Sequence, residues 1–354
     1  MSEATRAGDR VVAMITSPLE SEHVERIAST YPDRVDLIYR PDLMPAIRYV
    51  ADHGDPAWRR DPDQKRVWHG LLCQAEILFD FPLNENRPLL ELAPRLRWVQ
   101  TSSAGVGPLV QRLGLQDADL IVTTASGIHA QPLAEFVFAA LLFHTKEIGR
   151  LQVEQRARQW NRFAGVDLAG QTMVIIGPGR IGREIARIAR AFRMRVVAMG
   201  RDSDPARAEA LGIDRLYSRE DLHAMLGEAD CLVVCAPLTP ETEDLLGADE
   251  FAALKPGAVF VNIGRGAIID EDALLHGLRD GRIAFAALDV FREEPLPADS
   301  PFWGMPNVLI NPHSASTVTT ENAKLVELFT RNLGHYLAGE LDQMSPVLDK
   351  HRLY

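Results

Sequence analysis

Short runs of apolar, β-branched residues alternate with longer segments of helical periodicity along most of this 354-residue chain. Strands that alternate with helices form parallel sheets, because each helix returns the chain to the start of the next strand. The runs form two series, separated by a long helical pattern that begins after Pro132 and continues towards Trp160. The sequence therefore predicts an α/β protein with two doubly wound parallel sheets, one for each series.

The first series predicts five strands and two early helices. The strands are expected over residues 11–16, 35–39, 76–81, 96–101 and 120–124, and the helices over 19–29 and 63–73. The second series predicts strands over residues 172–177, 195–199, 231–235, 259–263, 284–288 and 308–310, and a closing helix near 318–338. Residues 41–63 have no clear period and predict a long irregular loop whose role cannot be inferred from the sequence.

Composition excludes several classes of protein. Hydrophobic residues make up 46% and charged residues 25%, a balance typical of soluble globular domains. The formal net charge of −11 argues against a nucleic-acid partner held by net charge. Three cysteines cannot form a disulfide framework, and Cys231 and Cys235 are expected in the core. No apolar run approaches the roughly 20 residues of a membrane span, and the polar N-terminus has no targeting pattern, so we expect a cytoplasmic location.

The most specific motif is Gly177-Pro178-Gly179-Arg180-Ile181-Gly182, which follows an apolar strand and precedes a helix-like segment over residues 183–192. Gly177 permits the tight turn, Gly179 lets a pyrophosphate approach the backbone, and Gly182 allows close helix–strand packing. The helix N-terminus then offers free N–H groups to phosphate. A Gly-rich turn alone is weak evidence, but strand, loop and helix in this order predict a dinucleotide site with no metal.

The next predicted strand indicates which dinucleotide is bound. NAD-binding sites place an acidic residue about 20 positions beyond the loop, where it bonds the ribose hydroxyls. Here Gly200 holds that position and Arg201 follows, so nothing repels a 2′-phosphate and a guanidinium can bind it. We therefore favour NADP(H) over NAD(H). The alternative is that Arg201 is solvated and that Asp202 binds the ribose.

Three downstream segments place polar residues after apolar strands: Asn262-Ile263-Gly264-Arg265-Gly266, the stretch from Asp289 to Glu294-Pro295, and Asn311-Pro312-His313. Open α/β sheets bind ligands at the carboxyl ends of their strands. Such a set suits reduction of a 2-oxo acid: Arg265 holds the carboxylate and polarises the carbonyl, His313 donates a proton, and Glu294 orients the imidazole. Taken singly, each could be an ordinary surface or turn residue. Together, after a dinucleotide loop, they favour catalysis.

These segments resemble the D-2-hydroxyacid dehydrogenase family, whose members carry the glycine loop, an Asn-x-x-Arg-Gly arginine, an Asp-Val-Phe…Glu-Pro glutamate and a Pro-His histidine. The resemblance covers residues 125–317. It implies that Arg265, Glu294 and His313 are catalytic and that Asp289 bonds the nicotinamide carboxamide. It also implies that Ala236, Pro237 and Ile263 line the cofactor path.

The resemblance further implies a domain arrangement. A Rossmann nucleotide domain, residues 128–316, is inserted into a flavodoxin-like substrate domain formed by residues 1–127 and 317–354. Family members are commonly dimers through their nucleotide domains, which makes the apolar helix after Pro132 a candidate interface for a homodimer.

A second match lies in the first series, over residues 98–107. It resembles the family's substrate loop, and Ala104, Gly105 and Val106 hold the positions whose backbone N–H groups receive the substrate carboxylate. An ordinary strand-to-helix turn is the alternative. Many relatives carry Asp where Gly107 stands, a departure that leaves the identity of the substrate open.

Two classes of function are compatible with these motifs. The favoured one is an NAD(P)-dependent reductase of a small 2-oxo acid, of the glyoxylate/hydroxypyruvate type, which acts without nucleic acid or membrane. Glu294 disfavours a formate dehydrogenase, since that branch resembles this one but has Gln beside its histidine. The alternative is a catalytically weak, NAD(P)-sensing binding protein similar to corepressors of the same fold.

Overall fold

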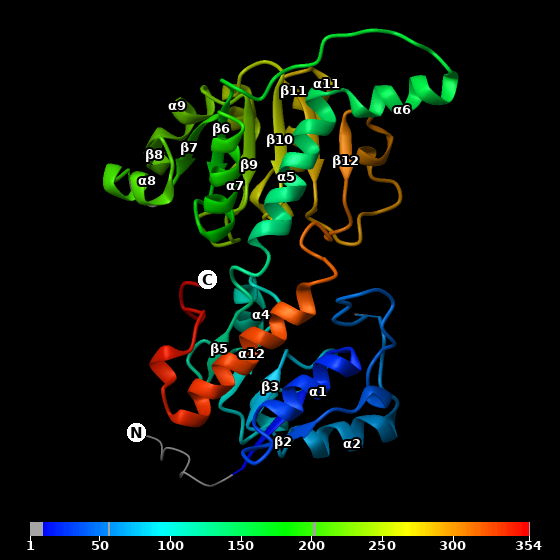
Figure 1. Ribbon diagram of the computed structural model, residues 1–354, viewed down its shortest axis with the longest axis vertical. Helices are drawn as coiled ribbons and strands as arrows, with labels where there is room; N and C mark the ends of the chain where they lie inside the picture. Colours follow the sequence, from blue (N-terminus) through cyan, green and yellow to red (C-terminus); the bar gives the residue numbers. More distant parts are fainter. Residues whose placement is uncertain (1–9, 56, 201–202, 354) are drawn as a thin grey trace. The chain divides into compact units, whose positions relative to one another are not determined.

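The structure is a computed structural model that describes residues 10–55, 57–200 and 203–353. The chain divides into two compact units (Figure 1). Unit 1 comprises Met1–Ile128 and Thr317–Tyr354, and unit 2 comprises His129–Ser316. This division lies one residue from the expected boundary. No helix in the described ranges has the length and apolar character that a membrane span requires.

Unit 1 is built on a five-stranded parallel sheet in the order β2-β1-β3-β4-β5. Its strands are β1 Val11–Ile15, β2 Val35–Ile38, β3 Ile77–Phe79, β4 Trp98–Gln100 and β5 Ile121–Thr123. Its α-helices are α1 Ser21–Thr30, α2 Pro62–Leu72, α3 Leu89–Leu92, α4 Gly107–Arg112 and α12 Glu321–Ala338. Two apolar clusters fill the unit, and the ring of Trp98 stacks on Phe329 of α12 at 5.2 Å.

Unit 2 is built on a seven-stranded parallel sheet in the order β12-β11-β10-β9-β6-β7-β8. Its strands are β6 Thr172–Ile176, β7 Arg195–Met199, β8 Arg215–Tyr217, β9 Cys231–Val234, β10 Ala258–Asn262, β11 Ile283–Leu288 and β12 Val308–Ile310. Its α-helices are α5 Ala130–Thr145, α6 Ile148–Ala157, α7 Arg180–Ala191, α8 Pro205–Leu211, α9 Leu222–Leu226, α10 Ala248–Ala253 and α11 Glu271–Arg279.

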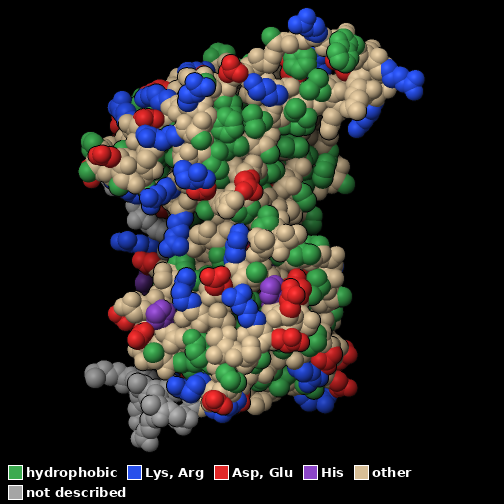
Figure 2. Space-filling model, in the orientation of Figure 1, with side chains coloured by type: hydrophobic (Ala, Val, Ile, Leu, Met, Phe, Trp, Pro, Cys, Tyr) green, Lys and Arg blue, Asp and Glu red, His purple; other side chains and the backbone are tan. Residues whose placement is uncertain are grey.

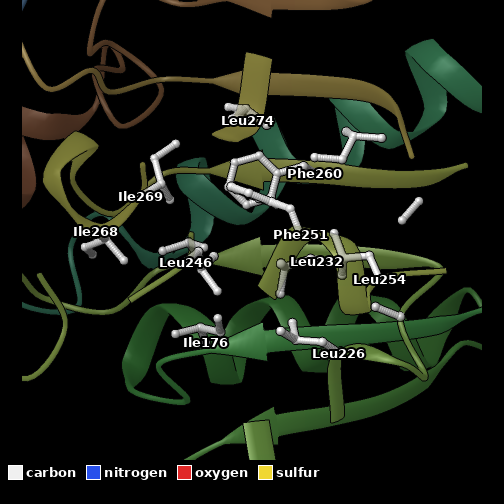
Figure 3. Packing of buried hydrophobic residues seen from close by; sticks show 14 of the residues in the cluster. Ile176, Leu226, Leu232, Leu246, Phe251, Leu254, Phe260, Ile268, Ile269 and Leu274 are labelled. Atoms are coloured by element: carbon white, nitrogen blue, oxygen red, sulfur yellow. The ribbon is translucent and has the colours of Figure 1, made fainter. Parts of the chain in front are cut away.

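Both faces of the unit 2 sheet are apolar, because its strands are covered by helices on each side. Figure 3 shows one face, where Phe251 of α10 meets Phe260 of β10 edge-on with ring centroids 5.5 Å apart. Cys231 is buried in the opposite layer, as predicted. Cys235 lies just beyond β9 and is half-buried, and burial raises the pKa of its thiol to about 12.

The prediction of one long helix after Pro132 is wrong. The chain forms α5 and α6, separated at Glu147, whose φ of +51° breaks the helical hydrogen-bond ladder. The α6 helix buries none of its residues, and together with the segment that follows it extends away from the sheet of unit 2 (Figure 1).

The expected irregular loop over residues 41–63 carries only a short 3₁₀ turn, Pro41–Leu43, among its described residues before α2 begins at Pro62. Arg60 fixes the segment to unit 1. Its buried guanidinium donates to the carbonyl of Leu43 at 2.9 Å and lies 3.7 Å from the centroid of the Trp68 ring. Burial lowers the pKa of Arg60 to about 10, and the nearby Glu85 opposes that shift.

Candidate active site

The glycine loop joins β6 to α7 at the point where the strand order of unit 2 reverses. From β6 the chain proceeds to β7 and β8 on one side, while β9, β10, β11 and β12 extend the sheet on the other. Open α/β sheets bind ligands at such a reversal. Gly177 follows β6, Gly179 immediately precedes α7, and Arg180, Ile181 and Gly182 form its first turn.

The space around Gly177 and Gly182 explains why no larger residue stands at these two positions of the glycine loop. Gly177 has φ +97°, and a Cβ on it would lie 2.6 Å from the Cα of Ala236. A Cβ on Gly182 would lie 2.6 Å from the carbonyl oxygen of Gly177, so α7 could not pack as closely on the loop. Over Gly179 a Cβ would meet nothing within 4 Å. This open, exposed helix N-terminus fits a pyrophosphate, which the first-turn N–H groups can bind.

The neighbouring strand completes this part of the site. Ala236, which is buried, and Pro237, which is exposed, follow β9, and the thiol of Cys235 donates to the carbonyl of Gly177 at 3.1 Å. The loops after β6 and β9 are therefore in direct contact. Arg201, the residue on which the NADP(H) prediction depends, lies outside the described residues.

The predicted catalytic residues follow the next three strands of the same parallel sheet. Arg265 follows β10, Glu294 follows β11 and His313 follows β12. Because the carboxyl ends of parallel strands meet one edge, the glycine loop, Pro237 and these three residues lie along a single edge of unit 2.

Glu294 and His313 form a hydrogen-bonded pair. The His313 Nδ1 lies 2.7 Å from Oε2 of Glu294, and Oε1 of Glu294 accepts from the backbone N–H of Phe291 at 2.9 Å. Burial opposes ionisation of this carboxyl group, but these two hydrogen bonds and the nearby charges of His313 and Arg265 lower its pKa below the ordinary value. Glu294 is therefore a carboxylate at neutral pH and gives the His313 ring a charged hydrogen-bond partner.

Arg265 is held by the strand that precedes it. The buried side chain of Asn262 accepts from the N–H of Gly264 at 3.0 Å and donates to the carbonyl of Arg265 at 3.2 Å. Arg265 is half-buried. Burial lowers the pKa of this guanidinium, and the carboxylates of Glu294 and Asp289 oppose that shift. An arginine stays protonated under such conditions, so a desolvated cation lies within electrostatic reach of the Glu294 carboxylate.

Ile263 and Asp289 are both buried in unit 2. Ile263 packs in the apolar layer between the sheet and its helices. Asp289 follows β11 and accepts hydrogen bonds from the loop that carries His313. We assigned no role to Asn262 or Asn311 from the sequence. The available signal is their place at the end of an apolar strand (Asn262) or directly after one (Asn311), where a side-chain amide can bond the loop that follows.

The proposed substrate loop lies in unit 1, after β4. Ala104 is half-buried, Gly105 is exposed, and Val106 is buried at the start of α4. The loop is tied to the residue that follows β3 by the hydroxyl of Ser102, which donates to Asp80 at 2.5 Å. Asp80 itself has φ +74°, a conformation that is costly for a residue with a side chain.

The unusual glycine of this loop has a steric cause. A Cβ on Gly107 would lie 2.1 Å from the carbonyl oxygen of Leu353, because the C-terminal segment packs against the start of α4. An aspartate at this position cannot coexist with that packing. The departure from the family pattern therefore reflects how the C-terminal segment of this chain is packed.

Comparisons with known proteins show which family the chain resembles. Residues 138–315 match the family described as "D-isomer specific 2-hydroxyacid dehydrogenase, NAD binding domain". A glyoxylate reductase of Aeropyrum pernix is 36% identical over 266 residues, which cover 72% of this chain and 77% of that protein.

Two solved structures share the fold over nearly the whole chain. A D-isomer specific 2-hydroxyacid dehydrogenase family protein of Aeromonas salmonicida superposes with a TM-score of 0.78 at 30% identity, covering 97% of this chain and 100% of that one. An NADPH-dependent glyoxylate/hydroxypyruvate reductase of Sinorhizobium meliloti, in complex with NADP and sulfate, gives 0.75 at 25% identity, with coverage of 98% and 100%.

Proposed function

Because the chain belongs to the D-isomer specific 2-hydroxyacid dehydrogenase family, and is thus a nicotinamide-dependent oxidoreductase, we propose that it reduces small 2-oxo acids with NADPH. The substrates are of the glyoxylate and hydroxypyruvate type, and the product of a prochiral substrate is a D-2-hydroxy acid. The observation that carries this proposal is the 2.7 Å pair of His313 and Glu294 on the sheet edge that also bears the glycine loop. The named relatives support the substrate class.

Each catalytic residue has a defined role in this reaction. Arg265 binds the substrate carboxylate and draws electron density from the carbonyl oxygen, which makes the carbonyl carbon more electrophilic. His313 donates a proton to that oxygen, and Glu294 keeps the imidazole oriented and charged until it does. The nicotinamide supplies the hydride. In unit 1, the backbone N–H groups of residues 104–106 contribute to carboxylate binding.

Product analysis tests this proposal. Wild-type enzyme with NADPH and hydroxypyruvate is expected to give only the D-isomer of glycerate, as measured by chiral chromatography. Formation of the L-isomer, or of a racemate, would contradict the family geometry on which the proposal depends.

The pH dependence should reveal the pairing of His313 with Glu294. Reduction requires imidazolium, so kcat/KM should fall as pH rises and the ring loses its proton. Glu294→Gln removes the carboxylate whose lowered pKa keeps it charged at neutral pH, so the falling limb should move to lower pH. Superimposable kcat/KM profiles for the wild type and this variant would exclude the coupling.

We further propose that NADPH is preferred because Arg201 binds its 2′-phosphate. A charge-assisted hydrogen bond of ~1.5–3 kcal/mol corresponds to a roughly 10- to 100-fold preference. Arg201→Ala should bring kcat/KM for NADPH close to that for NADH, whereas Asp202→Asn should leave the ratio near the wild-type value. A wild-type preference for NADH, or an NADPH preference that survives Arg201→Ala, would exclude Arg201 from the site.

A homodimer formed through unit 2 is the third part of the proposal. The α6 helix buries no residue, and Val153, Trp160 and Val166 expose 62%, 94% and 55% of their surface. Hydrophobic side chains gather over this region in Figure 2. Exposed apolar surface of this kind is typical of an interface, and a second copy covers it.

Light scattering should give twice the chain mass, and Trp160→Glu with Val153→Glu should give the monomer mass. A monomeric wild type would exclude the dimer.

A further inference from the structure

The C-terminal segment, residues 345–353, lies along the edge of the unit 1 sheet. It pairs antiparallel with β5, the outermost strand of that sheet, where the N–H of Leu348 donates to the carbonyl of Val122 at 2.8 Å (Figure 1). The side chain of Leu348 is buried in the same apolar cluster as Val106. The segment thus covers backbone groups that an edge strand would otherwise leave unpaired, and it belongs to the core of unit 1.

A buried polar chain links this segment to the beginning of the substrate loop, residues 101–107. Asn332 of α12 is fully buried. Its Oδ1 accepts from the N–H of Ser345 at 3.1 Å, and its Nδ2 donates to Oε1 of Gln100 at 3.1 Å. Gln100, also fully buried, is the last residue of β4, and its Nε2 donates to the carbonyl of Thr101 at 3.1 Å. Buried polar groups paired in this way favour one arrangement, because the alternatives leave some of them unpaired.

The other end of the substrate loop meets the same segment. Gly107 is buried and begins α4, and a Cβ on it would lie 2.1 Å from the carbonyl oxygen of Leu353 and 2.6 Å from its Cβ. Leu353 is itself buried, and its N–H donates to the carbonyl of Asp349 at 2.7 Å. Between these two ends the loop carries the backbone N–H groups of residues 104–106. Their placement therefore depends on contacts that the C-terminal segment makes at both ends of the loop.

We propose that the C-terminal segment is a positioning element for the substrate loop, and that it sets the affinity for the 2-oxo acid through Gly107 and the Asn332 linkage. This inference rests on the carboxylate-binding role proposed for residues 104–106. A positioning role predicts weaker substrate binding with unchanged cofactor affinity. A purely structural role predicts a loss of stability with no selective change in KM. All these residues belong to unit 1 and the glycine loop belongs to unit 2, so NADPH affinity is an independent readout.

Gly107→Ala tests the contact at the end of the loop. The added Cβ must move by about 1 Å or more to reach an ordinary contact distance from Leu353. Since a misplacement of about 1 Å can cost roughly 100-fold, we expect KM for the 2-oxo acid to rise by roughly 10- to 100-fold. The fall in kcat should be smaller, because a lost carboxylate contact weakens the ground state and the transition state alike. Gly70→Ala on α2, where a Cβ meets nothing within 4 Å, should keep KM within about twofold of the wild type.

Leu348→Ala tests the same contact from the side of the segment. It removes a buried anchor of the segment, so KM should rise several-fold. Leu72→Ala on α2 is the matched control, because Leu72 is a buried leucine of the same apolar cluster. It should lower Tm to a similar extent and leave KM near the wild-type value. The double variant Gly107→Ala with Leu348→Ala should have a KM no higher than that of Gly107→Ala alone, because a loosened segment makes room for the added methyl group.

Hydrogen exchange provides a readout that requires no turnover. Peptides that cover residues 101–107 should exchange faster in Leu348→Ala than in Leu72→Ala, although both variants lose the same side chain. The NADPH Kd, from fluorescence titration, should stay within about twofold of the wild type in all these variants.

Three results would overturn the positioning role. They are an unchanged KM in both Gly107→Ala and Leu348→Ala, a rise in KM for Leu72→Ala equal to that for Leu348→Ala, and effects that multiply in the double variant. If Gly107→Ala does not fold, Leu348→Ala and its control carry the test. Should the wild type reduce no 2-oxo acid while the loop still exchanges faster in Leu348→Ala, the proposed function fails and the positioning of the loop by the C-terminal segment stands.

Discussion

Replacing His313 with Ala should lower kcat for 2-oxo acid reduction by roughly 10²- to 10⁴-fold, the usual contribution of a positioned general acid. The loss follows because the variant has no group at this place that can protonate the developing alkoxide. Affinity for NADPH should stay near the wild-type value, since His313 follows β12 and the glycine loop follows β6. Steady-state kinetics and a cofactor titration measure the two quantities.

The chain offers a matched control for this substitution. His335, on α12 in unit 1, also bonds a glutamate, with its Nδ1 at 3.0 Å from Oε2 of Glu340. His335→Ala should keep kcat within about twofold of the wild type, an effect typical of a surface substitution. Wild-type kcat/KM in His313→Ala, or an equal loss in both variants, would remove His313 from the chemistry.

Arg265→Lys should lower kcat/KM by roughly 10²- to 10³-fold, comparable to removing one donor that stabilises a developing negative charge. Lysine keeps the charge but loses the planar fork, so it cannot bind the carboxylate with two parallel hydrogen bonds. KM should rise and kcat should fall, because the same group binds the substrate and polarises its carbonyl.

Arg187→Lys, on the exposed face of α7, is the control for this change. Its guanidinium pairs with Glu184 and its side chain is 68% exposed, so the conservative change there should leave both constants unaltered. If Arg265→Lys behaves like Arg187→Lys, the carboxylate is bound elsewhere and the role proposed for Arg265 is wrong.

Much of this architecture follows from local patterns. Eleven of the strands were expected within a few residues of their observed bounds, because fully buried parallel strands appear as continuous apolar runs. The strand Arg215–Tyr217 was not predicted, since three residues at the sheet edge form too short an apolar run to recognise. The break between α5 and α6 was not predicted for another reason. Glu147 adopts a left-handed conformation there, and a glutamate at that position gives no sequence signal of a helix end, as a Gly or Pro would.

In the candidate site, too, some residues could be predicted from the sequence and others could not. The residues that carry chemistry could be chosen because Arg, Glu and His after successive strands are typical of one function. The residues that hold the catalytic side chains in place could not be chosen in this way, because their roles depend on contacts formed only after folding. Asn262 bonds the Arg265 loop and Asp289 bonds the His313 loop. Likewise, the steric need for Gly107 depends on Leu353, nearly 250 positions away, and no local pattern reports it.

The most direct test of the central claim is turnover of NADPH with a panel of 2-oxo acids. Purified wild-type enzyme is offered glyoxylate, hydroxypyruvate, pyruvate and longer analogues, and cofactor oxidation is followed by absorbance, with His313→Ala assayed in parallel. We predict saturable turnover with glyoxylate or hydroxypyruvate as the best substrate, and a loss of that turnover in His313→Ala. Absence of turnover with every acid of the panel, under conditions where NADPH binds, would contradict the reductase assignment and favour a cofactor-sensing protein.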